Sequence, residues 1–227
     1  MSRNEAAYRH LRADVISCRL PPGQRLTEKQ LVADTGHGIA ALRDALTRLD
    51  QEGLIRTMPR KGYQVVPLTA KSVEDLFVVW RIIGPELVRL GVAHADDEAL
   101  AQAQAGFAAV DEAARDAPGA TTTLRLLASL EETFRVLAYA TSNDYLIDVF
   151  DRICGDMARV WVLILQADPM AAIRVTGPPV SDILEQRDTD RVAEGARAYI
   201  AESHERVLRA ITCRPSVISN DLGALHA

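Results

Sequence analysis

The chain has 227 residues, of which 48% are hydrophobic and 25% are charged. This length suits two domains of ordinary size, and this composition excludes a disordered or low-complexity chain. The formal net charge of -5 is divided unevenly. Residues 1–67 hold 11 Lys and Arg against 7 Asp and Glu, a net charge of +4, whereas residues 68–227 hold 15 against 24, a net charge of -9. The basic part of the chain is therefore confined to its N-terminal segment.

Cysteine usage and hydropathy indicate the compartment. The three cysteines, Cys18, Cys154 and Cys213, are an odd number without metal-ligand spacing, and no N-terminal apolar run precedes a cleavage site. The longest purely apolar stretch, Val160–Leu165, is far shorter than the roughly 20 residues that a membrane helix needs. We expect a cytoplasmic protein with reduced thiols and no membrane span.

Residues 4–18 predict a first helix, because Tyr8, Leu11 and Val15 recur at spacings of three and four. Residues 27–53 then predict two short helices around a tight turn. Thr27 can cap the first of these helices, Gly36 supplies a positive φ at the turn, and Gly53 ends the second helix. The second helix carries one apolar stripe, formed by Leu42, Leu46 and Leu49.

A small ribbon is expected directly after these helices. Residues 54–57 and 63–66 can pair as antiparallel strands, with residues 59–62 as the turn between them. The segment therefore predicts a helix-turn-helix followed by a wing.

Several cations are expected on the polar face of this unit. A helix fits the major groove of B-DNA, and a cationic ribbon tip can lie along the adjacent minor groove or the phosphates. Any one of these side chains taken alone is more often an ordinary solvated residue. The ordered series of cap, turn, leucine stripe and basic ribbon favours binding to double-stranded DNA. The cations are Lys29, Arg43, Arg48, Arg60 and Lys61.

Residues 8–67 resemble the winged-helix domain of GntR-family bacterial transcription regulators. The most specific segments are R-L-P-P-G-Q-R-L-T at 19–27, L-R-D-A-L-T-R-L at 42–49 and E-G-L-I at 52–55. The resemblance implies that Lys29 and Arg43 touch DNA. It also implies that the wing, formed by Arg60, Lys61 and Gly62, enters the minor groove.

The start of the recognition helix departs from this family. Its members usually have a Ser-Arg-Thr-Pro-like run there, whereas this chain has Gly38-Ile39-Ala40-Ala41. Without those donors, base reading must depend on Arg43, on apolar contact of Ile39 or Ala40 with thymine methyl groups, or on DNA shape. We therefore expect looser sequence specificity than is usual for the family.

From residue 72 onward the pattern is helical nearly everywhere. The fold class is thus mainly α, with a winged helix-turn-helix at 1–67 and an antiparallel helical bundle at 72–214. Gly84-Pro85 should kink or split the first helix, and Asn143 should cap the fourth, whose apolar stripe from Leu146 to Ile164 should be buried. The predicted helices are 72–94, 96–115, 120–141, 143–168, 180–187 and 189–213.

The bundle resembles, less closely, the all-helical effector domain of the FadR-like branch of the GntR family. Many of those domains hold a metal through an Asp and a His one helical turn apart and two later His residues. The corresponding positions here are Glu131, Arg135, Gly177 and Tyr199. Because a guanidinium and a glycine cannot coordinate a cation, we expect no metal and no other cofactor.

Two interpretations of this position stay open. Arg135 places a fixed positive charge where the family has a metal, and it can receive the carboxylate of a small organic acid. Alternatively, Glu131 and Arg135 form an internal ion pair in a sealed domain that binds nothing. The expected ligand-binding residues are Arg81, Glu131, Arg135, Arg159 and Tyr199.

The predicted function is that of a sequence-specific transcription regulator that acts as a homodimer on a two-half-site operator and senses a small-molecule effector. Repression is expected, and activation stays open. The alternative is a DNA-binding regulator whose helical domain is sealed and serves dimerisation alone. An enzyme is not expected, since no Ser-His-Asp, Cys-His or paired-acid motif is present.

Overall fold

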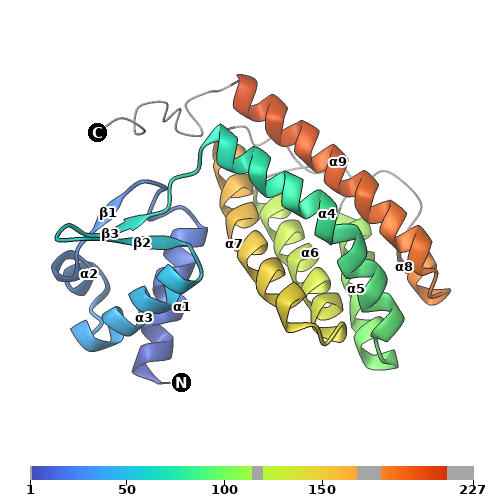
Figure 1. The fold of residues 1–227 in the computed structure, drawn as a ribbon, viewed down its shortest axis with the longest axis horizontal. Helices are drawn as coiled ribbons and strands as arrows, with labels where there is room; N and C mark the ends of the chain where they lie inside the picture. The colour runs from blue at the N-terminus through green and yellow to red at the C-terminus, as the bar shows by residue number, and fades with distance from the viewer. Residues whose placement is uncertain (1, 114–119, 168–179, 214–227) are drawn as a thin grey trace. The chain divides into compact units, whose positions relative to one another are not determined.

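The structure is a computed structural model that describes residues 2–113, 120–167 and 180–213. The link between Thr69 and Ala70 separates two compact units, and the first of them is drawn in blue and cyan in Figure 1.

The first unit is a winged helix-turn-helix. Its elements are α1 (Arg3–Ile16), β1 (Arg25–Leu26), α2 (Glu28–Thr35), α3 (Ile39–Gln51), β2 (Ile55–Met58) and β3 (Gly62–Val65). The predicted ribbon is confirmed, with each strand displaced by one residue from its expected position, and Ile55 lies opposite Val65. Strand β1 was not predicted. It pairs antiparallel with the free edge of β3, and two residues are too short to show a periodicity.

The turn of the helix-turn-helix follows the predicted chemistry. The Thr27 hydroxyl accepts a hydrogen bond from the Gln30 amide at 3.3 Å, which caps α2. Gly36, at φ 70°, ends α2 in the left-handed conformation. Helix α1, by contrast, ends at Ile16, earlier than expected, because the chain already turns at Cys18 with φ 55°.

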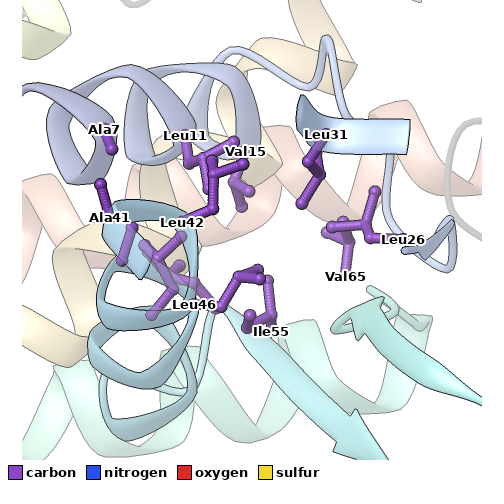
Figure 2. Close-up of a cluster of buried hydrophobic side chains, with 13 residues drawn as sticks. Ala7, Leu11, Val15, Leu26, Leu31, Ala41, Leu42, Leu46, Ile55 and Val65 are labelled. Carbon is purple, nitrogen blue, oxygen red and sulfur yellow. The ribbon is translucent and has the colours of Figure 1, made fainter. Parts of the chain in front are cut away.

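The leucine stripe of α3 lies in the core of this unit. Leu42, Leu46 and Leu49 are at most 1% exposed, and they pack with Leu11 and Val15 of α1 (Figure 2). Each fully buried leucine contributes about 1.5–3 kcal/mol, whereas a surface ion pair contributes about 0–1 kcal/mol. Apolar burial, not the ion pairs around it, therefore sets the rotation of α3.

The second unit consists of helices in its described residues: α4 (Ala70–His94), α5 (Asp97–Ala113), α6 (Ala120–Ala140), α7 (Asp144–Ala167), α8 (Val180–Glu185) and α9 (Thr189–Cys213). The predicted helices are confirmed to within two residues at the ends that fall on described residues, and the expected ends at 115 and 168 lie outside those residues. Asn143 caps α7 as expected, since its side-chain oxygen accepts a hydrogen bond from the Leu146 amide at 3.2 Å.

Two expectations for this unit were wrong in part. Helix α4 is not split at Gly84-Pro85 but runs on to His94, and the alternative of a kink at these residues stays a prediction. Both residues are buried, and a Cβ atom on Gly84 would lie 2.5 Å from the Ile200 side chain of α9, so tertiary packing holds the helix together through the proline. The α7 stripe is buried over most of its length, but Val149 is 41% exposed. Among the described helices, none is long and apolar enough to cross a membrane.

A side chain should be tolerated less well at Gly62 than at Gly23, although both glycines have a positive φ. Its φ is 82°, and a Cβ atom there would lie 2.5 Å from the Leu26 carbonyl oxygen, whereas Gly23 has φ 84° with open space around it. An alanine at a positive φ costs about 1–2 kcal/mol, and the clash adds about 1–3 kcal/mol. We expect Gly62→Ala to lower the opening free energy of α3 amides in hydrogen exchange by at least about 1 kcal/mol more than Gly23→Ala. Equal losses in the two variants would contradict this close approach.

Candidate functional site

Arg43 is presented on the surface of α3 in a fixed orientation. Its Nε and Nη2 atoms each donate a hydrogen bond of 2.8 Å to Glu28, in the first turn of α2, and its side chain is 62% exposed. The hydrogen bonds from Arg43 lower the pKa of Glu28, and the nearby Tyr63 of the wing lowers it slightly further. Glu28 thus connects α2 and α3.

Arg48 lies on a different side of the same helix. Its Nη1 atom donates a hydrogen bond to Glu5 of α1 at 3.0 Å, and its guanidinium carbon lies 3.5 Å from the centre of the Tyr8 ring. Two residues five apart on a helix point about 140° apart, so Arg43 and Arg48 do not share a face. The five predicted cations therefore do not form one surface, and the contacts of Arg48 favour a packing role.

The other predicted DNA-binding residues lie at the start of α2, the start of α3 and the wing, and all of them except the half-buried Gly62 are exposed. Ile39 is 49% exposed in the first turn of α3, whose N-cap residue Gly38 offers no side-chain hydrogen bond. Arg60 adopts φ 61° at the wing tip. Across residues 2–113, 120–167 and 180–213, no ion pair engages Lys29, Arg60 or Lys61, all of which are exposed. Gly62, with its positive φ, allows β3 to pass close to β1.

A polar chain behind the turn was missed by the sequence analysis. His10 Nδ1 of α1 and His37 Nε2, in the turn between α2 and α3, lie 3.1 Å apart, and His10 Nε2 lies 3.5 Å from the Asp14 carboxylate. Asp14 in turn pairs with Arg19. The two histidines are far apart in sequence and no spacing connects them, so only the tertiary structure brings them together.

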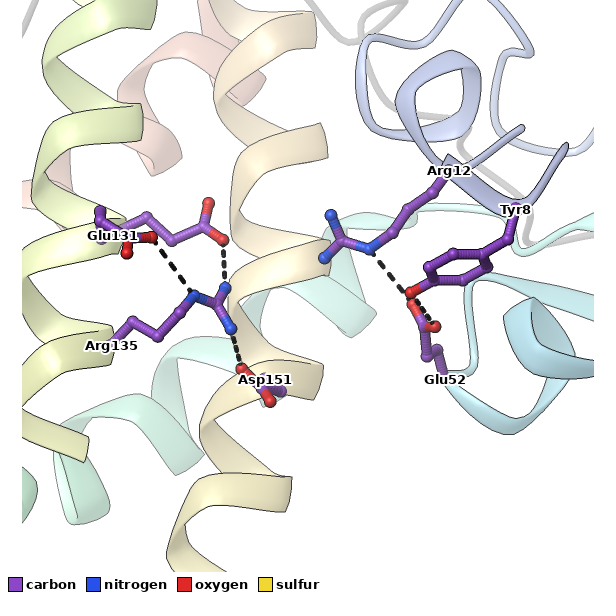
Figure 3. Close-up of polar contacts among 7 residues, drawn as sticks. Tyr8, Arg12, Glu52, Glu131, Arg135 and Asp151 are labelled. Atoms are coloured by element: carbon purple, nitrogen blue, oxygen red, sulfur yellow. Dashed lines mark hydrogen bonds and ion pairs between the residues drawn. The ribbon is translucent and has the colours of Figure 1, made fainter. Parts of the chain in front are cut away.

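In the helical unit, Arg135 is bonded to carboxylates of two helices. Its Nη2 atom donates a hydrogen bond to Glu131 of α6 at 2.7 Å, and its Nη1 atom donates one to Asp151 of α7 (Figure 3). The i,i+4 ion pair with Glu131 is the one expected as the alternative to a ligand. Asp151 was not predicted, because α7 approaches α6 only in the folded unit.

The remaining predicted ligand residues have other partners. Arg81 donates a hydrogen bond to His204 Nδ1 at 2.7 Å, and the opposite ring nitrogen of His204 lies 2.7 Å from Glu74. The fully buried Arg159 pairs with Asp156 at 3.0 Å. Burial raises the pKa of Tyr199 to about 12, and its ring centre lies 6.4 Å from that of Phe134. Arg81 also pairs with Glu74 at 3.4 Å, so Arg81, Arg135 and Arg159 each pair with different carboxylates.

These residues do not fit a metal ion. Arg135 offers only donor nitrogens where an imidazole would be needed, and Gly177 lies outside the described residues. In the part of the chain that the structure describes, no three His, Cys, Asp or Glu side chains are grouped so that they could hold a metal.

A winged helix-turn-helix ahead of an all-helical unit defines the class of winged-helix DNA-binding proteins. Residues 3–65 match the family described as "Bacterial regulatory proteins, gntR family". Residues 3–65 thus form a GntR-type regulatory domain.

Relatives with known sequences match about two fifths of the chain. An uncharacterized HTH-type transcriptional regulator YdhC of Bacillus subtilis (strain 168) is 29% identical over 93 residues, 41% of this chain and 42% of that protein. The HTH-type transcriptional repressor GlaR of Escherichia coli (strain K12) is 31% identical over 91 residues, 40% of this chain and 41% of that protein. The chain thus spans about two fifths of the length of these relatives.

Solved structures extend the likeness of fold to both units. E. coli McbR/YncC superposes with a TM-score of 0.71 and 17% identity, covering 95% of this chain and 99% of that one. A putative transcriptional regulator GntR from Rhodococcus sp. RHA1 has a TM-score of 0.65 and 18% identity, covering 92% of this chain and 99% of that one. At these identities the likenesses concern the fold alone.

Removal of Arg43 should change the titration of Glu28 but not that of Glu5. The pKa of Glu28 is lowered by Arg43, and that of Glu5 is lowered by Arg48 and then by Arg9. We expect the pKa of Glu28 to rise toward its ordinary value in Arg43→Met and that of Glu5 to stay where it is, as measured by carboxyl-carbon NMR titration. A variant Arg48→Met should give the opposite pattern. Because both pKa values are lowered, the two ion pairs stabilise the fold above the ordinary carboxyl pKa and lose that effect as the pH falls.

Proposed function

We propose that the chain is a DNA-binding transcription regulator that reads an operator through the face formed by Lys29, Ile39, Arg43 and the wing. The observation that carries this proposal is the exposure of Lys29, Arg60 and Lys61 on the elements that flank α3, free of intramolecular ion pairs among the described residues. Cations left in this state can each neutralise a phosphate and release counterions. Arg43 is also exposed, but it must share its donors with Glu28.

The start of α3 supports a limited reading of bases. The first turn of a recognition helix normally contacts base edges, and here its side chains are Ile39, Ala40 and Ala41. The exposed Ile39 can contact a thymine methyl group but can form no hydrogen bond with a base. Glu28 occupies two donors of Arg43, which leaves its remaining nitrogen available for DNA. This arrangement supports looser specificity and a share of readout through DNA shape.

A homodimer fits this proposal because a single winged helix covers one half-site only. The helical unit would supply the dimer interface. Large apolar side chains on α4, which are Val78, Val79 and Ile82, are 40–69% exposed and support such a role. Action on DNA also agrees with the expected cytoplasmic location, which stays part of the proposal.

Repression is the proposed sign of regulation. The relatives GlaR and RspR of E. coli, each 31% identical over their matched segments, are named transcriptional repressors. The relatives' names are those of regulators rather than enzymes, in agreement with the absence of catalytic motifs from the sequence.

Sensing of a small effector by the helical unit is the less constrained part of the proposal. An organic acid at Arg135 would have to displace Glu131 or Asp151, whose carboxylates already accept hydrogen bonds from both terminal nitrogens. The contacts therefore favour the sealed, ligand-independent dimerisation domain over a carboxylate sensor at this residue. An effector would have to bind through other groups of the unit.

The salt dependence of DNA binding should identify the phosphate contacts. Each phosphate contact contributes a slope of about 0.9 in the logarithm of affinity against that of salt concentration. With a duplex selected by the full chain from a random library, we expect the double variant Arg60→Ala, Lys61→Ala to reduce this slope by about 1.8, and Lys29→Ala by about 0.9. The exposed cation Arg209 of α9 provides the control, and Arg209→Ala should leave the slope unchanged. Unchanged slopes in all variants would refute the proposed interface.

The loss of binding free energy for each mismatched base pair should be small across the half-site. A mismatched base pair usually costs about 1–3 kcal/mol, and we expect losses below about 1 kcal/mol at most positions of the selected duplex, because the first turn of α3 lacks hydrogen-bond donors. A series of single base-pair substitutions, each measured by fluorescence anisotropy at one salt concentration, tests this. Steep losses at every position would contradict it. The variant Ile39→Arg should deepen the discrimination at the bases that face the start of α3.

A further inference from the structure

The Arg135 side chain holds two helices together through its charge. Its two terminal nitrogens donate to Glu131, one turn earlier on α6, and to Asp151, on α7 (Figure 3). Its third nitrogen, Nε, lies 3.7 Å from a carboxylate oxygen of Glu132. One planar cation is therefore surrounded by three carboxylates from two helices.

This cation is partly removed from water. The Arg135 side chain is 25% exposed, and its guanidinium carbon lies 5.8 Å from the centre of the Phe150 ring of α7. Burial by itself would lower the pKa of Arg135, but the carboxylates of Asp151 and Glu131 outweigh it and the pKa is raised. The guanidinium thus stays charged and needs these carboxylates as counterions.

A metal ion would perform the same task in a site of this kind. Without a cation between them, Glu131 and Asp151 would be two anions converging on one position from neighbouring helices, which is unfavourable. A divalent ion resolves such repulsion by coordinating both carboxylates, and a guanidinium resolves it by donating a separate hydrogen bond to each. The three carboxylates exceed the one positive charge, so an additional carboxylate ligand would meet a surplus of negative charge.

We propose that Arg135 is a built-in cation that takes the place of a metal ion, ties α6 to α7 through Glu131 and Asp151, and makes this position closed to both metals and carboxylate effectors. This inference concerns the helical unit alone and does not depend on DNA binding.

Thermal unfolding of the full chain tests the connection between the helices. Removing one partner of a partly buried ion pair is strongly destabilising, so Arg135→Gln should lower the Tm by at least about 5 °C. Arg135→Lys keeps the positive charge but lacks the planar guanidinium that can donate to two carboxylates at once. Its Tm should therefore lie between those of the parent chain and Arg135→Gln. The control is Arg209→Gln, which removes an exposed i,i+4 pair with Glu205 on α9 and should shift the Tm by less than about 1 °C. Equal Tm values for the Arg135→Gln and Arg209→Gln variants would overturn the proposal.

Titration with Zn²⁺ tests whether Arg135 takes the place of a metal ion. In Arg135→His the introduced imidazole joins Glu131 and Asp151, which gives the three protein ligands that Zn²⁺ accepts with a water as the fourth. We expect this variant to bind one more Zn²⁺ per chain in calorimetry than Arg135→Gln, whose other histidines provide the same background. The parent chain should bind no more Zn²⁺ than Arg135→Gln, and Zn²⁺ or a chelator should shift the Tm of these two proteins equally.

Two results of the titration would overturn the assignment. The first is that the parent chain binds one Zn²⁺ per chain and that Glu131→Gln abolishes this binding. The second is that Arg135→His binds no more Zn²⁺ than Arg135→Gln. Citrate serves as the carboxylate probe, and it should not raise the Tm of the parent chain more than that of Arg135→Gln. A larger increase for the parent chain would show that Arg135 receives carboxylates after all.

Discussion

Burial of the leucine face of α3 against α1 determines which polar groups of the first unit can meet DNA. Leu42, Leu46 and Leu49 fix the rotation of the helix, and the position of every other residue on α3 follows from it. Arg43 comes to the surface beside α2 and the wing, whereas Arg48 comes against Glu5 and Tyr8. The apolar contacts thus determine which way each arginine points, and the ion pairs restrain the arginine side chains in that position.

The two units differ in how many of their cations are paired with carboxylates. In the first, the cations on the exposed face outnumber their local counterions, and Lys29 and the wing remain available to an external polyanion. In the second, Arg135 and Arg81 are matched by carboxylates of the same unit. This difference explains how a chain with a net charge of -5 can carry a surface suited to DNA.

Glu28 shows how a carboxylate can belong to a cationic face. It reduces the local positive charge, but it also holds the Arg43 guanidinium in one orientation through two hydrogen bonds. A guanidinium restrained in this way loses less conformational entropy when it contacts a base or a phosphate. The cost in electrostatic attraction is therefore partly offset by the ordering of the side chain.

The sequence by itself determined the winged helix, the leucine stripe, the cap at Thr27 and the turn at Gly36, because each depends on residues close together along the chain. It also determined the helices of the second unit and the Glu131–Arg135 pair, which share a helix face. Only the tertiary structure decided which partners meet from separate elements: Glu28 with Arg43, His10 with His37, and Asp151 with Arg135. The continuity of α4 through Pro85 belongs to the same group. Contacts between residues distant in sequence depend on how the helices and strands pack together, and the local periodicity of the sequence does not determine that packing.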